Sequence, residues 1–228
     1  MRLSKSLASV SIFLAVLAVA RAWGADAPEQ CAGADSWKRS HPEPVDALRG
    51  QASNVAITNA GLLSELKARV EADQAARKKW LANPENEELA GAVNTLDTAN
   101  LIWLQKLISD QGFPTAAQVG KEGVHLAWVL LQHADKDPAL QRGLLPVLTQ
   151  RHAAGELPAN DLARISDRVL VANGEPQKYG TQFDWFAGDF TLPEPTTLAA
   201  VDASRAELGL MPLADYVCTI RKARANAK

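Results

Sequence analysis

Residues 124–141 read VHLAWVLLQHADKDPALQ, and this stretch indicates the fold class. Its first eight residues are apolar almost all round, which is typical of a helix buried at the centre of a bundle, although a strand would also fit them. Asp137 and Pro138 then begin another helix as its N-cap and first residue. Because the connection between the two helices is short, we expect them to pack as antiparallel neighbours.

Helical spacing of apolar residues continues on both sides of this stretch. The turn at residues 112–115 predicts Thr115 as the cap of a helix. Residues 177–183 alternate instead, and a turn at 187–189 can reverse the chain, so we predict a small antiparallel β-hairpin near residues 176–192. The predicted fold class is mainly α, a single-domain helical bundle with this hairpin. Its further helices are expected over residues 60–81, 86–110, 160–172, 198–208 and 213–223.

The N-terminus has the pattern of a signal peptide. Two basic residues supply a positive start, an apolar run follows, and Ala20-Arg21-Ala22 gives a cleavage site between small residues. We therefore expect residues 1–22 to be removed and the protein to be exported, periplasmic or secreted, with a retained anchor as the alternative. Residues 23–53, which contain several prolines, are expected to form an extended leader, and residues 54–228 a single helical domain.

The charge of the predicted mature chain argues against nucleic acid as a partner. The full sequence holds 24 basic and 26 acidic residues, and cleavage removes Arg2, Lys5 and Arg21 but no acidic residue. The remaining net charge of −5 repels a phosphate backbone. No later apolar run reaches the roughly 18 residues of a membrane helix, so we expect no membrane span after cleavage.

The predicted mature chain keeps two cysteines, Cys31 and Cys218. In an oxidising compartment they can form a disulfide that ties the start of the mature chain to its last helix. Chain-entropy models value so long a loop at roughly 5 kcal/mol at most. The alternative is that Cys218 is a small buried apolar residue of a helix.

Helical phase places polar side chains on the apolar face of the first helix of the domain. Gln74 and Arg77 fall within about 40° of that face, and Asp73 is beside them. An inward arginine needs a carboxylate, and Asp73 stands one turn away from Arg77. The alternative is an ion pair within one helix at the edge of the bundle. By the same reasoning, Asp167 of a later helix can be buried beside Arg168.

His133 is the histidine with the strongest claim to chemistry. It stands at the predicted end of the buried helix, where the helix dipole favours its protonated form, and Asp135 is close enough to orient it as a general base. The alternative is a histidine that caps free carbonyl groups. His125 and His133 would point about 80° apart, so no metal site is predicted. The sequence lacks the familiar phosphate, zinc and nucleophile motifs and predicts no cofactor.

A succession of polar motifs over residues 62–216 resembles a bacterial family known as a domain of unknown function. The motifs are Asp73-Gln74-x-x-Arg77, Gly112-Phe-Pro-Thr115, Val119-Gly120, Gln132-His-Ala-Asp135 with Gln141, Asp167-Arg-Val-Leu170, Gly174-x-x-Gln177-x-Tyr179-Gly-Thr-Gln182, and Arg205-x-x-x-Gly209-Leu with Pro212-Leu213 and Tyr216. The resemblance implies a shared polar site and brings no activity with it. The residues it implies are Asp73, Gln74, Arg77, His133, Asp135, Asp167, Arg168, Gln177, Tyr179 and Gln182.

Three interpretations of this site remain. We favour an exported domain that binds a small polar ligand or a protein partner around His133, Arg77 and the strand at 177–182, because no nucleophile or oxyanion-binding group can be named. Its ligand-binding residues would be Asp73, Gln74, Arg77, Gln132, Arg168, Gln177, Tyr179 and Gln182. In the second interpretation the protein is a hydrolytic enzyme in which His133 is the general base and Asp135 or Asp167 orients it. In the third, the polar network only fixes the packing of the helices.

Overall fold

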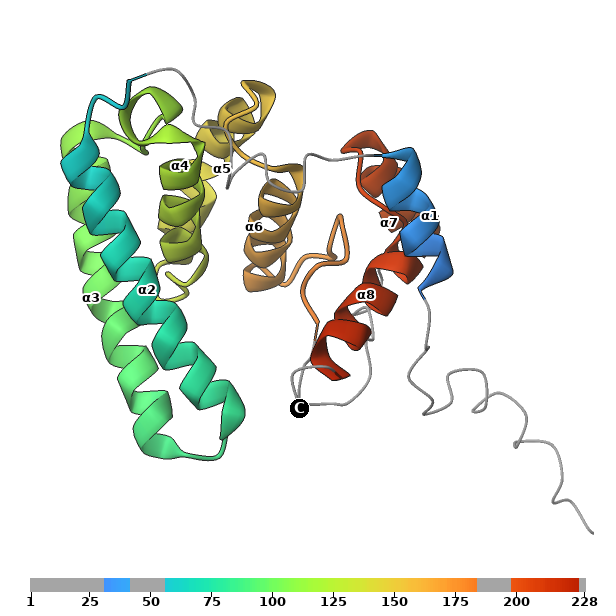
Figure 1. Ribbon diagram of the computed structural model, residues 1–228, viewed down its shortest axis with the longest axis horizontal. Helices are drawn as coiled ribbons and strands as arrows, with labels where there is room; N and C mark the ends of the chain where they lie inside the picture. Colours follow the sequence, from blue (N-terminus) through green and yellow to red (C-terminus); the bar gives the residue numbers. More distant parts are fainter. Residues whose placement is uncertain (1–30, 42–55, 184–197, 226–228) are drawn as a thin grey trace, which may run out of the picture.

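The computed structural model describes residues 31–41, 56–183 and 198–225, and within these ranges the regular secondary structure is helical (Figure 1). The helices are α1 (Ala32–Ser40), α2 (Ala60–Ala82), α3 (Glu87–Gln111), α4 (Ala116–Gln132), α5 (Pro138–Ala153), α6 (Ala159–Ala172), α7 (Leu198–Glu207) and α8 (Leu213–Ala225). The mainly α fold class is therefore confirmed. None of these described helices has the length and apolar composition of a membrane-spanning segment.

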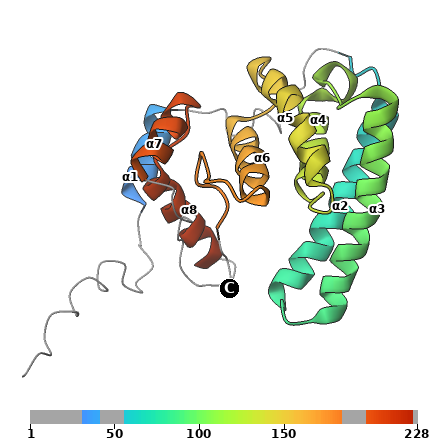
Figure 2. The same cartoon turned by 180° about the vertical axis from the view of Figure 1, so that it is seen from behind.

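Helix α4 forms the centre of the larger apolar core. It contacts α2 and α3, which run side by side as a long hairpin, and α6 lies on its other side next to α5 (Figures 1 and 2). Leu131 of α4, Leu66 of α2 and Leu104 of α3 are fully buried in this core. The apolar stretch that the sequence places inside a bundle is thus the central helix.

Two helix starts follow the capping chemistry that the sequence predicts. The Thr115 hydroxyl accepts the Gln118 N–H at 3.2 Å, while Gln118 Oε1 accepts the Thr115 N–H at 2.9 Å. At the start of α5, Asp137 Oδ1 accepts the Leu140 N–H at 3.0 Å, and Pro138 is the first helical residue. Both predicted caps are confirmed: Thr115 fixes the start of α4, and Asp137 fixes the start of α5.

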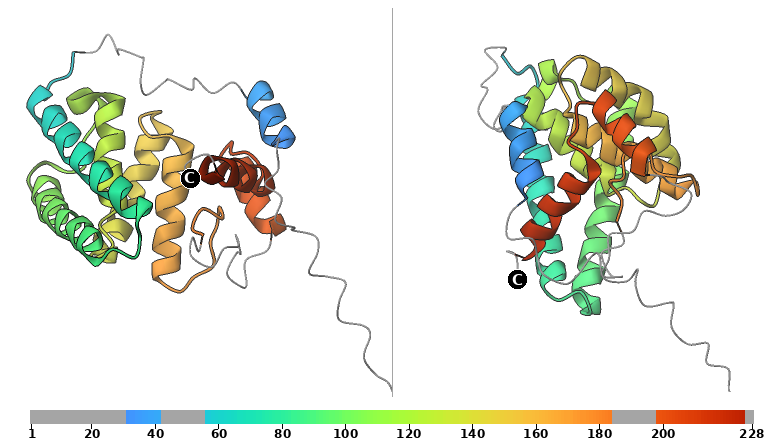
Figure 3. Two further views of the ribbon diagram at one scale, coloured as in Figure 1. Left: turned by 60° about the horizontal axis from the view of Figure 1, so that its bottom comes forward. Right: turned by 90° about the vertical axis from the view of Figure 1, so that its right-hand side faces the viewer.

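Helices α1, α7 and α8 lie together at one end of the molecule (Figure 3). A smaller apolar cluster joins α7 and α8 at Val201, Leu213, Tyr216 and Val217. Within residues 23–53, where the sequence predicts an extended leader, residues 32–40 form α1 instead. This helix forms because it has a packing partner: α1 contacts α8, and Cys31 and Ala34 are buried.

The predicted β-hairpin near residues 176–192 is wrong. Residues 175–183 contain no strand and form an irregular loop, and the returning half, residues 184–192, lies outside the described residues. The physical reason is a competing acceptor, because the carboxylate of Asp167 on α6 takes backbone N–H groups of the loop that a neighbouring strand would have taken.

Candidate functional site

Four ionisable side chains meet where α2, α3 and the end of α4 approach one another, and we call them the Arg77 cluster: Asp73, Arg77, Asp97 and His133. Arg77 lies between the two carboxylates, with its Nε 3.2 Å from Asp73 Oδ1 and its Nη2 paired with Asp97 Oδ1. The Asp73 side chain is 1% exposed, whereas Arg77 is 19% and His133 17% exposed. The cluster therefore combines one sealed carboxylate with groups that reach solvent.

His133, the C-cap of α4, joins the cluster through Nδ1. This atom lies 3.0 Å from Asp73 Oδ2 and 3.1 Å from Arg77 Nε. A proton on Nδ1 would be donated to Asp73, whereas a bare Nδ1 would accept from Arg77. In the first state Nε2, which receives no hydrogen bond from the described part of the chain, is left as a base.

The pKa values of the two carboxylates in the cluster shift in opposite directions. Burial raises the pKa of Asp73, but the hydrogen bond and charge of His133 and the charge of Arg77 outweigh it, so the pKa lies below its ordinary value. Burial also raises the pKa of Asp97, and there Arg77 compensates only in part, so the pKa lies above its ordinary value. Asp97 is thus the more easily protonated carboxylate.

The Arg77 cluster also holds donor atoms of the kind that bind metal ions. One oxygen each of Asp73 and Asp97 and one ring nitrogen of His133 lie within 4.8 Å of one another. The Arg77 guanidinium bonds to both carboxylates and to His133 Nδ1, so it already supplies the positive charge at this point. The cluster pairs its own charges, and we assign it no ion.

A pocket of about 230 Å³ lies where the α4–α5 turn, α5, α6 and the loop at 175–183 meet. It shares no residue with the Arg77 cluster. Arg168 Nη1 is 2.5 Å from Asp135 Oδ1 in its wall. The full lining is Asp135, Pro138, Gln141, Arg168, Val171, Ala172 and Gln182. The pocket therefore presents one cation, one anion and two amides beside apolar side chains.

Helix carbonyl groups hold both glutamines of the pocket. Gln141, which is 1% exposed, donates its Nε2 to Leu131 O at 3.0 Å, and Gln182 donates its Nε2 to Arg164 O at 3.2 Å. Because a carbonyl group can only accept, these bonds identify the nitrogen of each amide and leave the other atom as a carbonyl oxygen. Neither Oε1 receives a hydrogen bond from the described residues, so each remains an acceptor.

Asp167 anchors the loop at 175–183. Its Oδ1 accepts the N–H groups of Lys178 at 2.8 Å and Tyr179 at 2.9 Å, and its Oδ2 accepts both the N–H and the hydroxyl of Thr181 at 2.8 Å. Burial raises the pKa of Asp167 above its ordinary value, although these hydrogen bonds lower it. Both oxygens are thus committed to the loop and do not contact His133.

Reciprocal hydrogen bonds close the same loop. Gln177 Nε2 donates to Gln182 O at 2.7 Å, and the Gln182 N–H donates to Gln177 Oε1 at 2.7 Å. The buried Tyr179 packs with Leu210, and Arg205 Nη1 donates to the Tyr179 carbonyl at 2.8 Å. Gln177 and Tyr179 therefore support the position of Gln182 at the pocket.

The predicted site residues divide into three groups instead of forming the one shared polar site that the resemblance implies. The Arg77 cluster includes Asp73, Arg77 and His133, with Gln74 donating to Asp73 at 2.7 Å. The pocket includes Asp135, Arg168 and Gln182. The loop anchor includes Asp167, Gln177 and Tyr179. Gln132 belongs to none of them, and its buried Oε1 has no partner among the described residues. His133 and Asp135 thus contribute to different sites although they are two residues apart.

Two residues that complete these sites are missing from the predicted set. Asp97 lies four positions after the buried Val93 and three positions before the buried Asn100. Helical phase on α3 therefore indicates that Asp97 lies on the buried face. Gln141 shares the buried face of α5 with Leu144, three positions later. In both cases a polar residue interrupts an apolar stripe.

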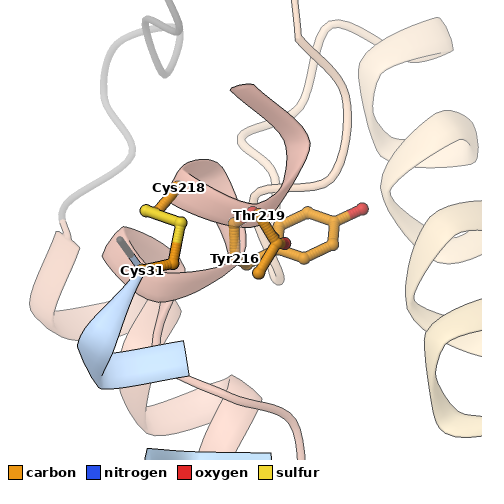
Figure 4. Close-up of a disulfide and its surroundings, with 4 residues drawn as sticks. All are labelled: Cys31, Tyr216, Cys218 and Thr219. Atoms are coloured by element: carbon orange, nitrogen blue, oxygen red, sulfur yellow. A yellow bond between two sulfur atoms is a disulfide. The ribbon is translucent and has the colours of Figure 1, made fainter. Parts of the chain in front are cut away.

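Cys31 is bonded to Cys218, as Figure 4 shows. Cys31 is the N-cap residue of α1, and Cys218 lies in α8. Of the two alternatives that the sequence leaves open for Cys218, the structure has the disulfide.

These features define a class: a helical domain with a terminal disulfide, a partly sealed ion cluster and a pocket of mixed charge. A family model covers residues 60–226, which include both the cluster and the pocket. The chain belongs to this family, whose description is Family of unknown function (DUF6624). No curated protein matches the chain, and no solved structure matches it. The expected membership of a family of unknown function is confirmed.

Proposed function

We propose that this protein is an exported domain that binds a small polar ligand in the pocket between α5, α6 and the loop at 175–183. The observation that carries the proposal is the lining of this pocket, in which an arginine, an aspartate and two glutamines stand beside three apolar residues. Small-molecule sites typically combine apolar walls with a few polar groups that fix the orientation of the ligand.

The polar groups of the pocket are held in position by the protein itself. Gln141 is fixed by the end of α4 and Gln182 by α6, while Arg168 and Asp135 hold each other. Side chains that are already ordered lose little conformational entropy on binding, which favours affinity. A purely structural network would not need two amide oxygens without partners beside an open pocket.

The disulfide supports the proposed export. Disulfides persist in the periplasm and outside cells and are rare in the reducing cytosol. Cys31 and Cys218 are bonded, and the described part of the chain has no free cysteine. Together with the signal-peptide pattern of residues 1–22, which lie outside the described residues, this favours a periplasmic or secreted protein.

A blocked pocket tests the proposed function. A library of small polar metabolites is screened by ligand-observed NMR, first against the wild-type protein and then against Val171→Trp. Val171 lines the pocket and is 44% exposed, so an indole ring can fill the pocket without disturbing the core. We expect each true ligand to bind Val171→Trp at least about tenfold more weakly, which is about 1.4 kcal/mol.

Ile102→Trp is the matched control, because Ile102 is also an exposed aliphatic residue of a helix, at 63% exposure, and lies outside the pocket. This variant should bind as the wild type does. If no compound binds the wild type, or if every binding compound is unaffected by Val171→Trp, ligand binding at this pocket is wrong.

A second candidate function is hydrolysis with His133 as general base. One observation favours it: His133 Nδ1 lies 3.0 Å from the sealed Asp73 carboxylate, an arrangement that can hold the ring with Nε2 free. The orienting carboxylate in this candidate is Asp73, since Asp135 pairs with Arg168 and Asp167 with the loop.

Purified protein and its His133→Gln variant should be compared on ester, amide and phosphoester substrates. General-base catalysis contributes about 10²- to 10⁴-fold, so the variant should lose at least a hundredfold in kcat. An Asp135→Asn variant is the control, because Asp135 does not contact His133 in this arrangement. Absence of turnover in the wild type, or equal turnover in His133→Gln, rules out this candidate.

A further inference from the structure

We propose that the pocket takes a zwitterion: a small aliphatic α-amino acid whose carboxylate binds Arg168 and whose ammonium group binds Asp135 and the two glutamine oxygens. This inference deepens the proposed function and rests on it. Three properties of the pocket carry it. The Arg168 guanidinium has unused hydrogen-bond donors, three side chains offer acceptors, and the charges of Asp135 and Arg168 balance.

The first property is a guanidinium with unused donors. Arg168 bonds to Asp135 through Nη1, and its Nη2 makes no hydrogen bond to the described residues. A guanidinium can hold a carboxylate through two parallel hydrogen bonds, which one bond to Asp135 does not exploit. A ligand carboxylate therefore matches Arg168 better than its present single contact does.

The second property is a set of three acceptors around one pocket. Gln141 and Gln182 each use the amide nitrogen on a helix carbonyl group, which leaves both Oε1 atoms as acceptors. The Asp135 carboxylate is the third, and its side chain is 63% exposed. A primary ammonium group has three N–H donors and no acceptor, so its hydrogen-bonding capacity equals what these three residues offer.

The third property is the charge balance. Asp135 and Arg168 neutralise each other across the pocket wall, and a ligand with one charge would take one partner and leave the other unpaired. A zwitterion gives each residue a new partner of opposite charge, so no ion is left without a counterion. The exchange of partners therefore selects ligands that carry both charges.

The size and the apolar part of the pocket limit the ligand further. Its volume of about 230 Å³ lies below the roughly 300 to 1,000 Å³ of pockets for drug-sized ligands. The remaining walls are Pro138, Val171 and Ala172, which suit a short aliphatic side chain. Leucine and valine fit this description.

The test compares ligands that differ by one charged group. Isothermal titration calorimetry measures the binding of L-leucine, of isocaproate, which lacks the ammonium group, and of isopentylamine, which lacks the carboxylate. We expect L-leucine to bind at least about tenfold more tightly than either single-charge analogue, and L-valine to bind comparably to L-leucine. Equal binding of L-leucine and one analogue overturns the proposal.

Two variants assign the contacts, and each has a matched control. Asp135→Asn should weaken L-leucine binding at least about tenfold but should not weaken isocaproate binding, and Arg168→Gln should weaken L-leucine similarly but should not weaken isopentylamine binding. Each variant removes the ion that the single-charge ligand would leave unpaired. Asp110→Asn removes a carboxylate of another surface ion pair, and Arg69→Gln removes an arginine of similar exposure, 27% against 24%. Both control variants should bind L-leucine as the wild type does.

The outcomes separate this inference from the proposed function. If metabolites from the library bind at the Val171 pocket but L-leucine and L-valine do not, the zwitterion is wrong and the binding function stands. If L-leucine binds and Val171→Trp does not weaken its binding, L-leucine binds elsewhere, and both the zwitterion site and its location in this pocket are wrong. If nothing in either panel binds, the proposed function itself fails.

Discussion

Asp73 and Asp97 bind the same guanidinium, yet their pKa values move in opposite directions. The more deeply buried residue, Asp73, has the lowered pKa, because Arg77, His133 and Gln74 all bond to its carboxylate. Asp97 has Arg77 as its hydrogen-bond donor among the described residues. The number of donors at each carboxylate, more than its depth, decides the direction in which its pKa shifts.

We expect Asp73→Asn and Asp97→Asn to change the pH dependence of stability with opposite signs. The lowered pKa of Asp73 means that its ionised form stabilises the fold above the unfolded-state pKa of about 3.9, and this contribution is lost as pH falls through the folded-state pKa. The raised pKa of Asp97 means the reverse: its contribution is present below about 3.9 and is lost as pH rises through the folded-state pKa.

Urea unfolding from about pH 2 to about pH 7 measures both effects. The unfolding free energy of the wild type minus that of Asp73→Asn should grow with pH, whereas the difference from Asp97→Asn should shrink. Asp110→Asn, in an exposed ion pair with Lys106, serves as the control and should give a nearly flat difference. Slopes of the same sign for Asp73→Asn and Asp97→Asn would show that the donor count does not govern these carboxylates.

The helices were largely predictable from local sequence, and the loop at 175–183 was not. Caps such as Thr115 and Asp137 act within one turn, so their signal is contained in adjacent residues. The alternation of residues 177–183 also looks local, but the acceptor for the loop N–H groups is Asp167, on a different element. A hydrogen-bond acceptor far away in the sequence prevents the strand that the alternation predicts, and the spacing of neighbouring residues does not reveal such an acceptor.

The same distinction explains what could be predicted of the candidate sites. Helical phase predicted that Arg77 and Asp73 point inward, because both lie on one helix whose apolar stripe is visible. Phase within single helices cannot say which inward residues of different helices meet. The sequence therefore grouped His133 with Asp135, while packing pairs His133 with Asp73 and Asp135 with Arg168.

Removal of the Asp167 carboxylate should destabilise the fold through the loop. In Asp167→Ala, three backbone N–H groups and one hydroxyl lose their acceptor, and each buried donor left unsatisfied costs about 1 to 3 kcal/mol. Allowing for water at the more open donors, we expect a loss of about 2 to 5 kcal/mol in urea unfolding.

Limited proteolysis of the same variant should show faster cleavage within residues 175–183. Asp167→Asn, which keeps one acceptor oxygen, should lose less stability than Asp167→Ala, and Asp110→Ala is the exposed control. A change below about 0.5 kcal/mol in Asp167→Ala would mean that the loop does not depend on its anchor.

At the scale of the whole molecule, the described residues form three apolar clusters that polar contacts also join. The largest lies among α2 to α6, a second joins α7 and α8, and the third packs Ala163 of α6 against Tyr179 and Leu210. The loop at 175–183 contributes Tyr179 to the third cluster and is bonded to Asp167 of α6 and to Arg205 of α7. Arg164 of α6 also donates to the Tyr216 hydroxyl of α8 at 3.4 Å.

Loss of the disulfide should lower the stability of the molecule while leaving the larger core folded. The Cys31→Ser, Cys218→Ser double variant frees a cross-link with a sequence separation of 187, which chain-entropy models value at about 5 kcal/mol as an upper figure. Urea unfolding compares the variant with wild type, with and without reductant. Equal stability of oxidised wild type and variant would show that the cross-link contributes nothing.

The position of this cross-link has a topological consequence. Cys31 and Cys218 enclose residues 32–217, so the backbone and the disulfide together form a closed covalent ring that contains both the Arg77 cluster and the pocket. A single peptide-bond cleavage anywhere in that ring opens it without separating the fragments. Once nicked, the protein would remain one covalent molecule until the disulfide was reduced. The two fragments would therefore stay close together, so the residues that each contributes to the Arg77 cluster or the pocket would keep a high effective concentration with respect to one another.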